Sequence, residues 1–221
     1  MENKSIRNIF VIGGTGRTGT ILIEKLTKLG YNVTSVTRSD PTKCKNFGPN
    51  NKWIHCDVYE NKQGNLTDLL KNQDAVISTL GGKSGSPKDL YYVSYLNVLN
   101  SMYDAGVKRL IMVTADGTHK QHGYFFKYVV KKLFLSSVLV DTEKTEDYIK
   151  NSYKGSVDWT IIRPFRLLDG EKGKYRAALE DQYPSDGKSW TWESFTGDVA
   201  QFCIDELTKN EYVKKLVSTG I

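Results

Sequence analysis

Three glycines near the start of the chain, Gly13, Gly16 and Gly19, are spaced three residues apart in the stretch FVIGGTGRTG. An apolar run precedes them, and leucine and isoleucine recur at helical spacing after them, which predicts a strand, a tight turn and a helix. In that setting Gly13 allows the turn, Gly16 lets a phosphate approach the backbone, and Gly19 lets the helix pack on its strand. Because a helix N-terminus favours an anion, the stretch predicts dinucleotide binding, with an ordinary flexible turn as the alternative.

The residue at the end of the second predicted strand, YNVTSVTR, is Arg38. A protein specific for NAD usually has an acidic residue there, which holds the ribose 2′-hydroxyl. An arginine can instead form two hydrogen bonds to a 2′-phosphate, so we expect NADPH or NADP as the cofactor and NAD less. Lys43 or Lys45 could help, whereas the nearby Asp40 keeps open the alternative of a solvated surface arginine.

Two further strand ends carry residues that suit a nucleotide. Asp57 follows the third predicted strand, KWIHCDV, and its carboxylate could accept a hydrogen bond from the adenine amino group. Gly81 and Gly82 follow the fourth, DAVISTLG, where small residues would let the backbone lie against the cofactor, although an ordinary loop explains them too.

The positions of these residues depend on a regular alternation of strand-like and helix-like segments along the chain. This alternation predicts an α/β fold, a doubly wound parallel sheet with its ligand crevice at the carboxyl ends of the strands. With 221 residues and no linker or repeat, we expect a single domain over 1–221, with a smaller substrate-side portion at about 164–221.

Composition excludes several other classes of protein. Three cysteines and three histidines are too few and too scattered for a disulfide framework or a metal site. The net charge of +6 is spread along the chain, so it fits an anionic cofactor better than nucleic acid. The chain has neither a signal-peptide core nor eighteen consecutive apolar residues, so we expect no membrane association and a cytoplasmic location.

Several segments together resemble a known family: GGTGRTG, CDV, AVISTLGG, LNVLNSMYDAGVKRLIMVT, DWTIIRPFRLLDGEKGKYRA and GDVAQFCIDEL. Over nearly its full length the chain resembles the atypical short-chain dehydrogenase/reductases of the NAD(P)H-binding, NmrA-like kind, closest to the flavin reductase/biliverdin-IXβ reductase branch. The resemblance implies a Rossmann fold that binds NADP(H). With Gly19 of the turn included, the cofactor-binding residues that it implies are Gly13, Thr15, Gly16, Arg17, Thr18, Gly19, Arg38, Asp57, Val58, Leu80, Gly81, Lys83, Thr114 and Pro164.

The catalytic residues are less clear, because two positions depart from the pattern of that branch. Asp116 stands where the biliverdin reductases have a serine, and Arg166 where they have a histidine. An aspartate donates a proton at neutral pH only when its pKa is raised, whereas Arg166 could bind a flavin phosphate or a propionate. The catalytic candidates are therefore Thr114, Asp116, Arg166 and also Tyr175, which we expect on the substrate side.

A second set of candidates is Tyr128 and Lys132, which form the Tyr-x-x-x-Lys pair used by many short-chain dehydrogenases. Their segment, YFFKYVVKKLF, is rich in aromatic and aliphatic residues and is better interpreted as a packing segment.

The function expected from these observations is NADPH-dependent hydride transfer to a flavin or a similar planar acceptor, a biliverdin-like tetrapyrrole included. Two alternatives remain open. One is a non-catalytic NADP(H) sensor that binds a protein partner, and the other is a carbonyl reductase or epimerase that uses Tyr128 and Lys132.

Overall fold

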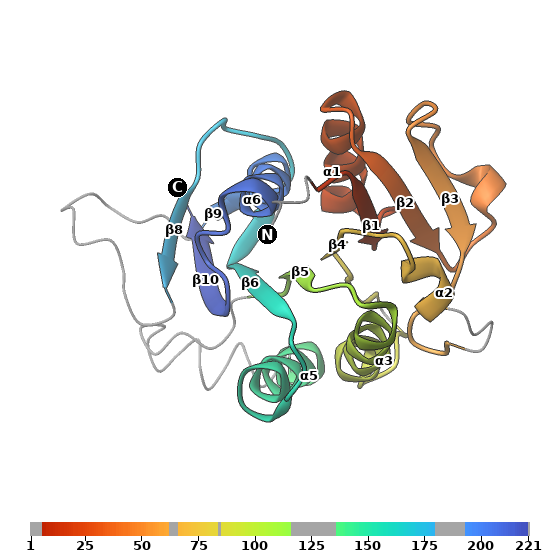
Figure 1. Ribbon diagram of the computed structural model, residues 1–221. Coiled ribbons are helices and arrows are strands. Elements are labelled where there is room, and N and C mark those ends of the chain that lie inside the picture. The colour runs from red at the N-terminus through yellow and green to blue at the C-terminus, as the bar shows by residue number, and fades with distance from the viewer. Residues whose placement is uncertain (1–5, 62–65, 84, 116–135, 180–192, 221) are drawn as a thin grey trace.

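The computed structural model describes residues 6–61, 66–83, 85–115, 136–179 and 193–220. Its centre is an eight-stranded sheet in the order β3-β2-β1-β4-β5-β6-β10-β8 (Figure 1). All neighbouring strands in it are parallel except β8, which runs antiparallel to β10. Its strands are β1 (Asn8–Ile12), β2 (Asn32–Thr37), β3 (Asn51–His55), β4 (Ala75–Ser78), β5 (Arg109–Val113), β6 (Asp158–Pro164), β8 (Arg176–Leu179) and β10 (Lys215–Gly220).

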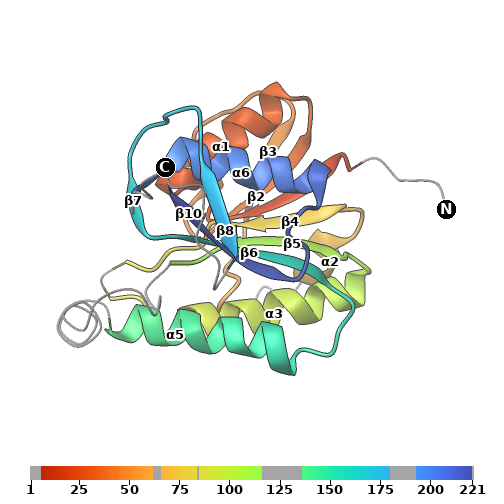
Figure 2. The same cartoon turned by 90° about the vertical axis from the view of Figure 1, so that its left-hand side faces the viewer.

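Helices cover both faces of this sheet. Figure 2 shows α1 and α6 on one face and α3 and α5 on the other. The α-helices are α1 (Arg17–Lys28), α2 (Leu66–Leu70), α3 (Leu90–Ala105), α5 (Ser136–Asp147) and α6 (Thr196–Lys209). The short elements are a 3-10 turn (Pro41–Lys43), a π-helical turn that continues α5 (Tyr148–Ser152), and a separate parallel pair of strands, β7 (Arg166–Leu168) and β9 (Glu193–Phe195).

The two faces of the sheet bury two separate apolar clusters, because successive side chains of a strand point to opposite faces. In β1, Ile9 and Val11 belong to the cluster with Leu22 of α1, whereas Phe10 packs in the other cluster with Tyr95 of α3. All five side chains are at most 1% exposed. A strand that is buried on both faces appears in the sequence as a continuous apolar run. This is why the apolar run before the glycines predicted the first strand.

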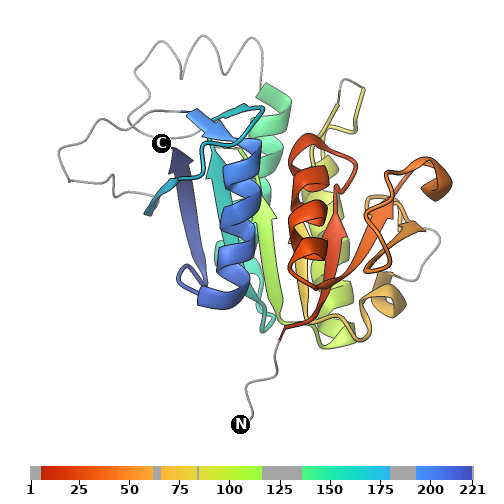
Figure 3. The ribbon, with the colours of Figure 1, turned by 90° about the horizontal axis from the view of Figure 1, so that it is seen from above.

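The predicted α/β, doubly wound fold is confirmed, and the strand order reverses between β1 and β4. Such a reversal opens a crevice at the carboxyl ends of the strands. Figure 3, a view from above, shows the strands side by side, with α1 and α6 lying next to each other across them. The described residues form a single domain, in which β10 and β8 extend the sheet beyond β6.

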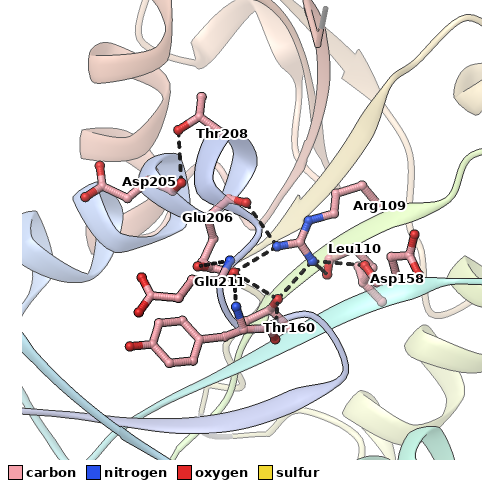
Figure 4. A network of polar contacts seen from close by, with 9 residues as sticks. Arg109, Leu110, Asp158, Thr160, Asp205, Glu206, Thr208 and Glu211 are labelled. Atoms are coloured by element: carbon pink, nitrogen blue, oxygen red, sulfur yellow. Dashed lines mark hydrogen bonds and ion pairs between the residues drawn. The ribbon is translucent and has the colours of Figure 1, made fainter. Parts of the chain in front are cut away.

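At the amino-terminal edge of β5 and β6, a buried ion pair ties the sheet to α6 (Figure 4). The Nη2 of Arg109 lies 3.1 Å from Oε2 of Glu206, and both side chains are less than 10% exposed. Arg109 also donates to the carbonyl of Asp158 at 3.0 Å and to the hydroxyl of Thr160 at 2.9 Å. Glu206 in turn accepts from the backbone N–H of Tyr212 at 3.1 Å. A buried charge is tolerated only with such partners, so this cluster holds two strands and a helix in one arrangement.

No helix within the described ranges is long and apolar enough to cross a membrane.

Candidate cofactor site

The glycine-rich turn after β1 is tightly packed at two of its three spaced glycines. Gly13 has a φ of +78°, and a Cβ atom added there would lie 2.6 Å from the backbone of Thr79. A Cβ at Gly19 would lie 2.8 Å from the Cα atom of Gly14. At Gly16 the nearest contact for a Cβ is the carbonyl oxygen of Gly13 at 3.2 Å. Gly13 and Gly19 therefore seat the turn on β4 and α1, whereas Gly16 is the glycine without close packing on a neighbouring strand.

The N-terminus of α1 has the features of an anion site. Its N-cap is Gly16, no side chain caps the helix, and no acidic residue stands in the first turn. The first amides of a helix need partners from outside the helix, and the helix dipole favours a negative one. The amides of Arg17 and Thr18 therefore fit the pyrophosphate of a dinucleotide.

A cleft of about 390 Å³ lies beside this helix end, at the carboxyl edge of the sheet. Its charged lining consists of Arg17, Arg38 and Lys83 with the single carboxylate of Asp57, which suits an anionic ligand. Eleven of the fourteen residues predicted to bind the cofactor line it: Gly13, Thr15, Gly16, Arg17, Thr18, Arg38, Asp57, Val58, Leu80, Gly81 and Lys83.

The end of the cleft next to β2 and β3 has the groups expected around adenosine. Arg38 is exposed there, and its carbonyl oxygen lies 3.1 Å from Nε2 of His55. Oδ1 of Asp57 accepts a hydrogen bond from the backbone N–H of Tyr59 at 2.9 Å, which fixes the carboxylate at the cleft wall. Lys45, a predicted helper, instead pairs with Glu24 at 3.1 Å.

Sequence reasoning missed Tyr59, whose side chain lines the same end of the cleft. Its hydroxyl donates to Oδ1 of Asp89 at 3.0 Å, and this bond is the main reason why the pKa of Tyr59 is raised. The sequence carried one signal for this residue, namely that an aromatic side chain stands two positions after Asp57.

Three of the predicted cofactor residues do not line the cleft. Gly19 has the packing role described above, and Pro164 is buried at the end of β6. Thr114 follows β5, is 8% exposed, and donates its hydroxyl hydrogen to Oε1 of Glu146 at 2.6 Å.

Glu146 is the centre of a second buried ion pair, which sequence reasoning did not identify. It lies on α5, is 4% exposed, and accepts hydrogen bonds from Nε of Arg163 at 3.0 Å and from the Nη2 atom of the same side chain. Arg163 is the next-to-last residue of β6, so the pair joins α5 to the carboxyl ends of β5 and β6. Thr114 is thereby held in a fixed rotamer at the edge where a bound nicotinamide would lie.

The segment after β6 reaches back over the nucleotide turn. Leu167 of β7 lines the cleft, and Oδ1 of Asp169 pairs with Nη1 of Arg17 at 2.8 Å. The same segment is anchored on α6, because the carboxylate of Asp198 accepts hydrogen bonds from the backbone N–H groups of Lys172 and Gly173. Leu167 falls within the portion at about 164–221 that was expected on the substrate side.

Two catalytic candidates lie away from the cleft. Arg166 does not line it and pairs with Glu193 of β9 at 3.1 Å. Tyr175, contrary to the prediction, lies on the α6 side: its ring centroid is 4.7 Å from that of Phe202, and its hydroxyl donates to Asp205 at 2.7 Å. Burial is the main cause of the raised pKa of Tyr175. The anchoring of the preceding residues on Asp198 explains this placement, because it directs the chain toward α6.

The other catalytic candidates, Asp116, Tyr128 and Lys132, lie outside the described residues. Within the described ranges, no group of three or more His, Cys, Asp or Glu side chains is placed to hold a metal ion.

Comparison with known proteins shows the family. The NAD(P)H-binding family matches residues 13–210. A curated relative, the chloroplastic divinyl chlorophyllide a 8-vinyl-reductase of Cucumis sativus, is 22% identical over 99% of this chain and 54% of its own length. The chain thus spans about half the length of the first curated relatives that it matches.

Solved structures share the fold. A Rossmann-fold NAD(P)-binding protein from Shigella flexneri superposes with a TM-score of 0.71 at 22% identity, covering 97% of this chain and 93% of its own. A proposed NADH-flavin reductase from Streptococcus pneumoniae superposes with the same score at 21% identity, over 97% and 99% of the two chains. The glycine turn, the uncapped helix and the family match agree, and the chain belongs to the NAD(P)H-binding family, of the NmrA-like, short-chain dehydrogenase/reductase type.

Proposed function

We propose that the protein is an NADPH-dependent reductase that passes a hydride to a flavin or a similar planar acceptor, such as a biliverdin-like tetrapyrrole. The observation that carries the proposal is the cleft at the carboxyl edge, which has Arg38 at its β2 side, the free N-terminus of α1 at its centre, and Leu80 and Leu167 in its lining. In this proposal the cationic group matches the 2′-phosphate of the adenosine, the amides match the pyrophosphate, and the apolar wall matches the nicotinamide.

Each part of the cleft has its own role. The amides of Arg17 and Thr18 bind the pyrophosphate, and the guanidinium of Arg38 binds the 2′-phosphate that distinguishes NADPH from NADH. Leu80 and Leu167 exclude water at the nicotinamide end. When bound there, NADPH supplies a hydride from its nicotinamide ring.

The proton that follows the hydride comes from solvent in this proposal. Tyr59 is the phenol among the described cleft residues, and its hydroxyl is bonded to the carboxylate of Asp89. The chain's main contribution to rate is therefore to position the two reactants and to exclude competing water. The names of two similar proteins, a divinyl chlorophyllide reductase and a proposed NADH-flavin reductase, support a reductase reaction.

The test is to mix the purified protein with NADPH and either FMN or biliverdin and to follow the nicotinamide absorbance band. We expect NADPH to be oxidised with at least one acceptor. Gly16→Val should abolish NADPH binding while circular dichroism stays unchanged, because a branched side chain would occupy the space of the pyrophosphate. Tight NADPH binding without oxidation by any acceptor would instead favour the sensor.

A further inference from the structure

A second cavity, of about 300 Å³, adjoins the cofactor cleft. Gly82, Lys83 and Leu90 line both of them. It lies between the loop that follows β4, the beginning of α3 and the beginning of α5. None of the residues assigned above to the adenosine, the pyrophosphate or the buried ion pairs explains why this space is left open.

Apolar side chains form part of the inner wall of this second cavity, beside the polar Ser86, Ser137 and Asp141. Leu90 and Tyr91 are buried, and the hydroxyl of Tyr91 hydrogen-bonds to the backbone of Gly82, which fixes the ring against the loop. Val138 of α5 also lines the cavity and is 38% exposed. Concave apolar surface with a few polar groups is the usual composition of a small-molecule site.

The rim of the cavity is cationic. Lys83 and Lys88 are both exposed, and neither forms an ion pair within the described part of the chain. The carboxylate of Asp141 lines the cavity too, but it is 5% exposed and accepts the backbone N–H groups of Tyr91 at 2.6 Å and Tyr92 at 3.2 Å. Its charge is thus directed to the N-terminus of α3, and the two ammonium groups are the charges left for a ligand.

We infer that this second cavity is the acceptor subsite of the proposed reductase, and that it selects planar acceptors with an anionic group, a phosphate or a carboxylate, at the periphery. The apolar walls would hold the ring system, and Lys83 and Lys88 would bind the anion. This inference rests on the proposed function. The sequence suggested Arg166 as the residue that binds the anion of the acceptor, but Arg166 forms an ion pair with Glu193. In this inference the two lysines take that role.

The reaction in this arrangement is balanced without a further reagent. The acceptor gains a hydride from the nicotinamide and a proton from water, and NADPH leaves as NADP⁺. The lysines keep their protons and act only on binding. For Lys88, which does not line the cofactor cleft, the effect is therefore expected in the affinity for the acceptor and not in the affinity for the nucleotide.

The first test measures binding of FMN and of uncharged riboflavin to the NADP⁺-loaded protein by flavin fluorescence. Lys88 is the better target, because it lines the second cavity and not the cleft. Lys88→Gln should weaken FMN binding by about tenfold, the scale of one charge-assisted contact, and leave riboflavin unchanged. The matched control is Lys108→Gln, an exposed lysine beside β5 at the opposite edge of the sheet, which should change neither. Biliverdin and its dimethyl ester give the same comparison for carboxylates.

The second test addresses the apolar wall through two exposed valines of the same helix. Val138 lines the cavity, whereas Val140, 55% exposed, lines neither space. Val138→Asp should weaken riboflavin and FMN alike, and Val140→Asp should weaken neither. Since both side chains are exposed, both variants should fold, which circular dichroism and NADPH affinity will check.

The outcomes separate the subsite from the proposed function. Equal FMN affinity in Lys88→Gln and Lys108→Gln, together with equal behaviour of the ester and the acid, overturns the subsite even when NADPH is oxidised. Absence of flavin and biliverdin binding at millimolar concentration overturns it as well. Selective weakening in Lys88→Gln and Val138→Asp supports the subsite, and in that case a lack of NADPH oxidation would refute only the reductase.

Discussion

The two buried arginine–glutamate pairs lie at opposite ends of the same two strands and on opposite faces of the sheet. Arg109 and Glu206 join the amino ends of β5 and β6 to α6, whereas Arg163 and Glu146 join the carboxyl end of β6 to α5. The first pair bonds mainly to backbone groups of the strands, of α6 and of the turn after it, together with the hydroxyl of Thr160 in the interior of the sheet. In the second pair, Glu146 also accepts a hydrogen bond from the hydroxyl of Thr114, at the edge of the sheet that carries the cleft.

This difference indicates what each pair is for. A buried ion pair that is bonded to fixed backbone adds rigidity, and replacing one partner leaves an uncompensated charge. A pair that also orients a side chain at the ligand edge can affect affinity through that side chain. We therefore expect the amino-end pair to act on stability alone and the carboxyl-end pair to act on stability and on the site.

The largest effect is expected for Glu206→Ala. Removing this carboxylate leaves the Arg109 guanidinium buried without its partner, which should lower the free energy of unfolding by about 3–5 kcal/mol. Urea denaturation measures this loss. The NADPH dissociation constant of the folded fraction should stay the same, and a tenfold change in it would contradict a purely structural role.

Arg38→Ala tests the nucleotide end of the carboxyl edge. Loss of a charge-assisted contact should weaken NADPH binding by about 1.5–3 kcal/mol and leave NADH binding nearly unchanged. Because Arg38 is exposed, the unfolding free energy should not move. Titration of both nucleotides measures the difference, and equal dissociation constants for NADPH and NADH in the unmodified protein would show that Arg38 does not select the 2′-phosphate.

Glu146→Gln tests whether the carboxyl-end pair affects the cofactor site as well as stability. The amide keeps the size of the side chain but loses its charge, so a stability loss of about 1–3 kcal/mol is expected from the weakened bonds to Arg163 and Thr114. Turnover or NADPH affinity should also fall in Glu146→Gln, whereas we expect both to stay unchanged in Glu206→Ala. Thr114→Val is the companion variant, since it removes the same hydroxyl contact and leaves the ion pair intact. If Glu146→Gln behaves like Glu206→Ala, the contrast between the two pairs is wrong.

The smallest effect is expected for Asp169→Asn, which breaks the ion pair with Arg17 across the mouth of the cleft. The two side chains are 73% and 60% exposed, and exposed ion pairs contribute about 0–1 kcal/mol. Thermal unfolding should therefore change little, and high salt should abolish any difference. A large loss of stability would mean that the segment after β6 depends on this contact far more than its exposure suggests.

The part of the molecule that was predictable from sequence is the part with a strong local signal. The glycine turn, the strands around it and the cofactor type of the family follow from apolar periodicity and from glycine spacing. The carboxyl-terminal strands β7 to β10 were not predicted, because they are short and depend on pairing with distant residues. Buried charges such as Glu146 and Glu206 lie on helices, where a single sequence cannot tell a buried acid from a solvated one.

Tyr175 shows the same limit in the site. Its position in GKY suggested the substrate side, but the direction of the chain there is set by Asp198, a residue more than twenty positions later. Lys83, which was predicted to bind the cofactor, lines the cleft, whereas the adjoining cavity with Lys88 and Val138 depends on how α3 and α5 pack together, and no local pattern reports that.

The free N-terminus of α1 has a consequence for how long the protein survives at a given temperature. The N-cap of α1, Gly16, offers no capping side chain and no acid stands in the first turn, so a bound anion can accept hydrogen bonds from the first amides of the helix. A ligand that binds the folded state alone stabilises it by mass action, by about 2.7 kcal/mol when its concentration is one hundred times its dissociation constant. The concentration of free nucleotide relative to its dissociation constant would thus set not only occupancy but also resistance to heat and to proteolysis, and depletion of nicotinamide nucleotide would shorten the lifetime of the folded chain.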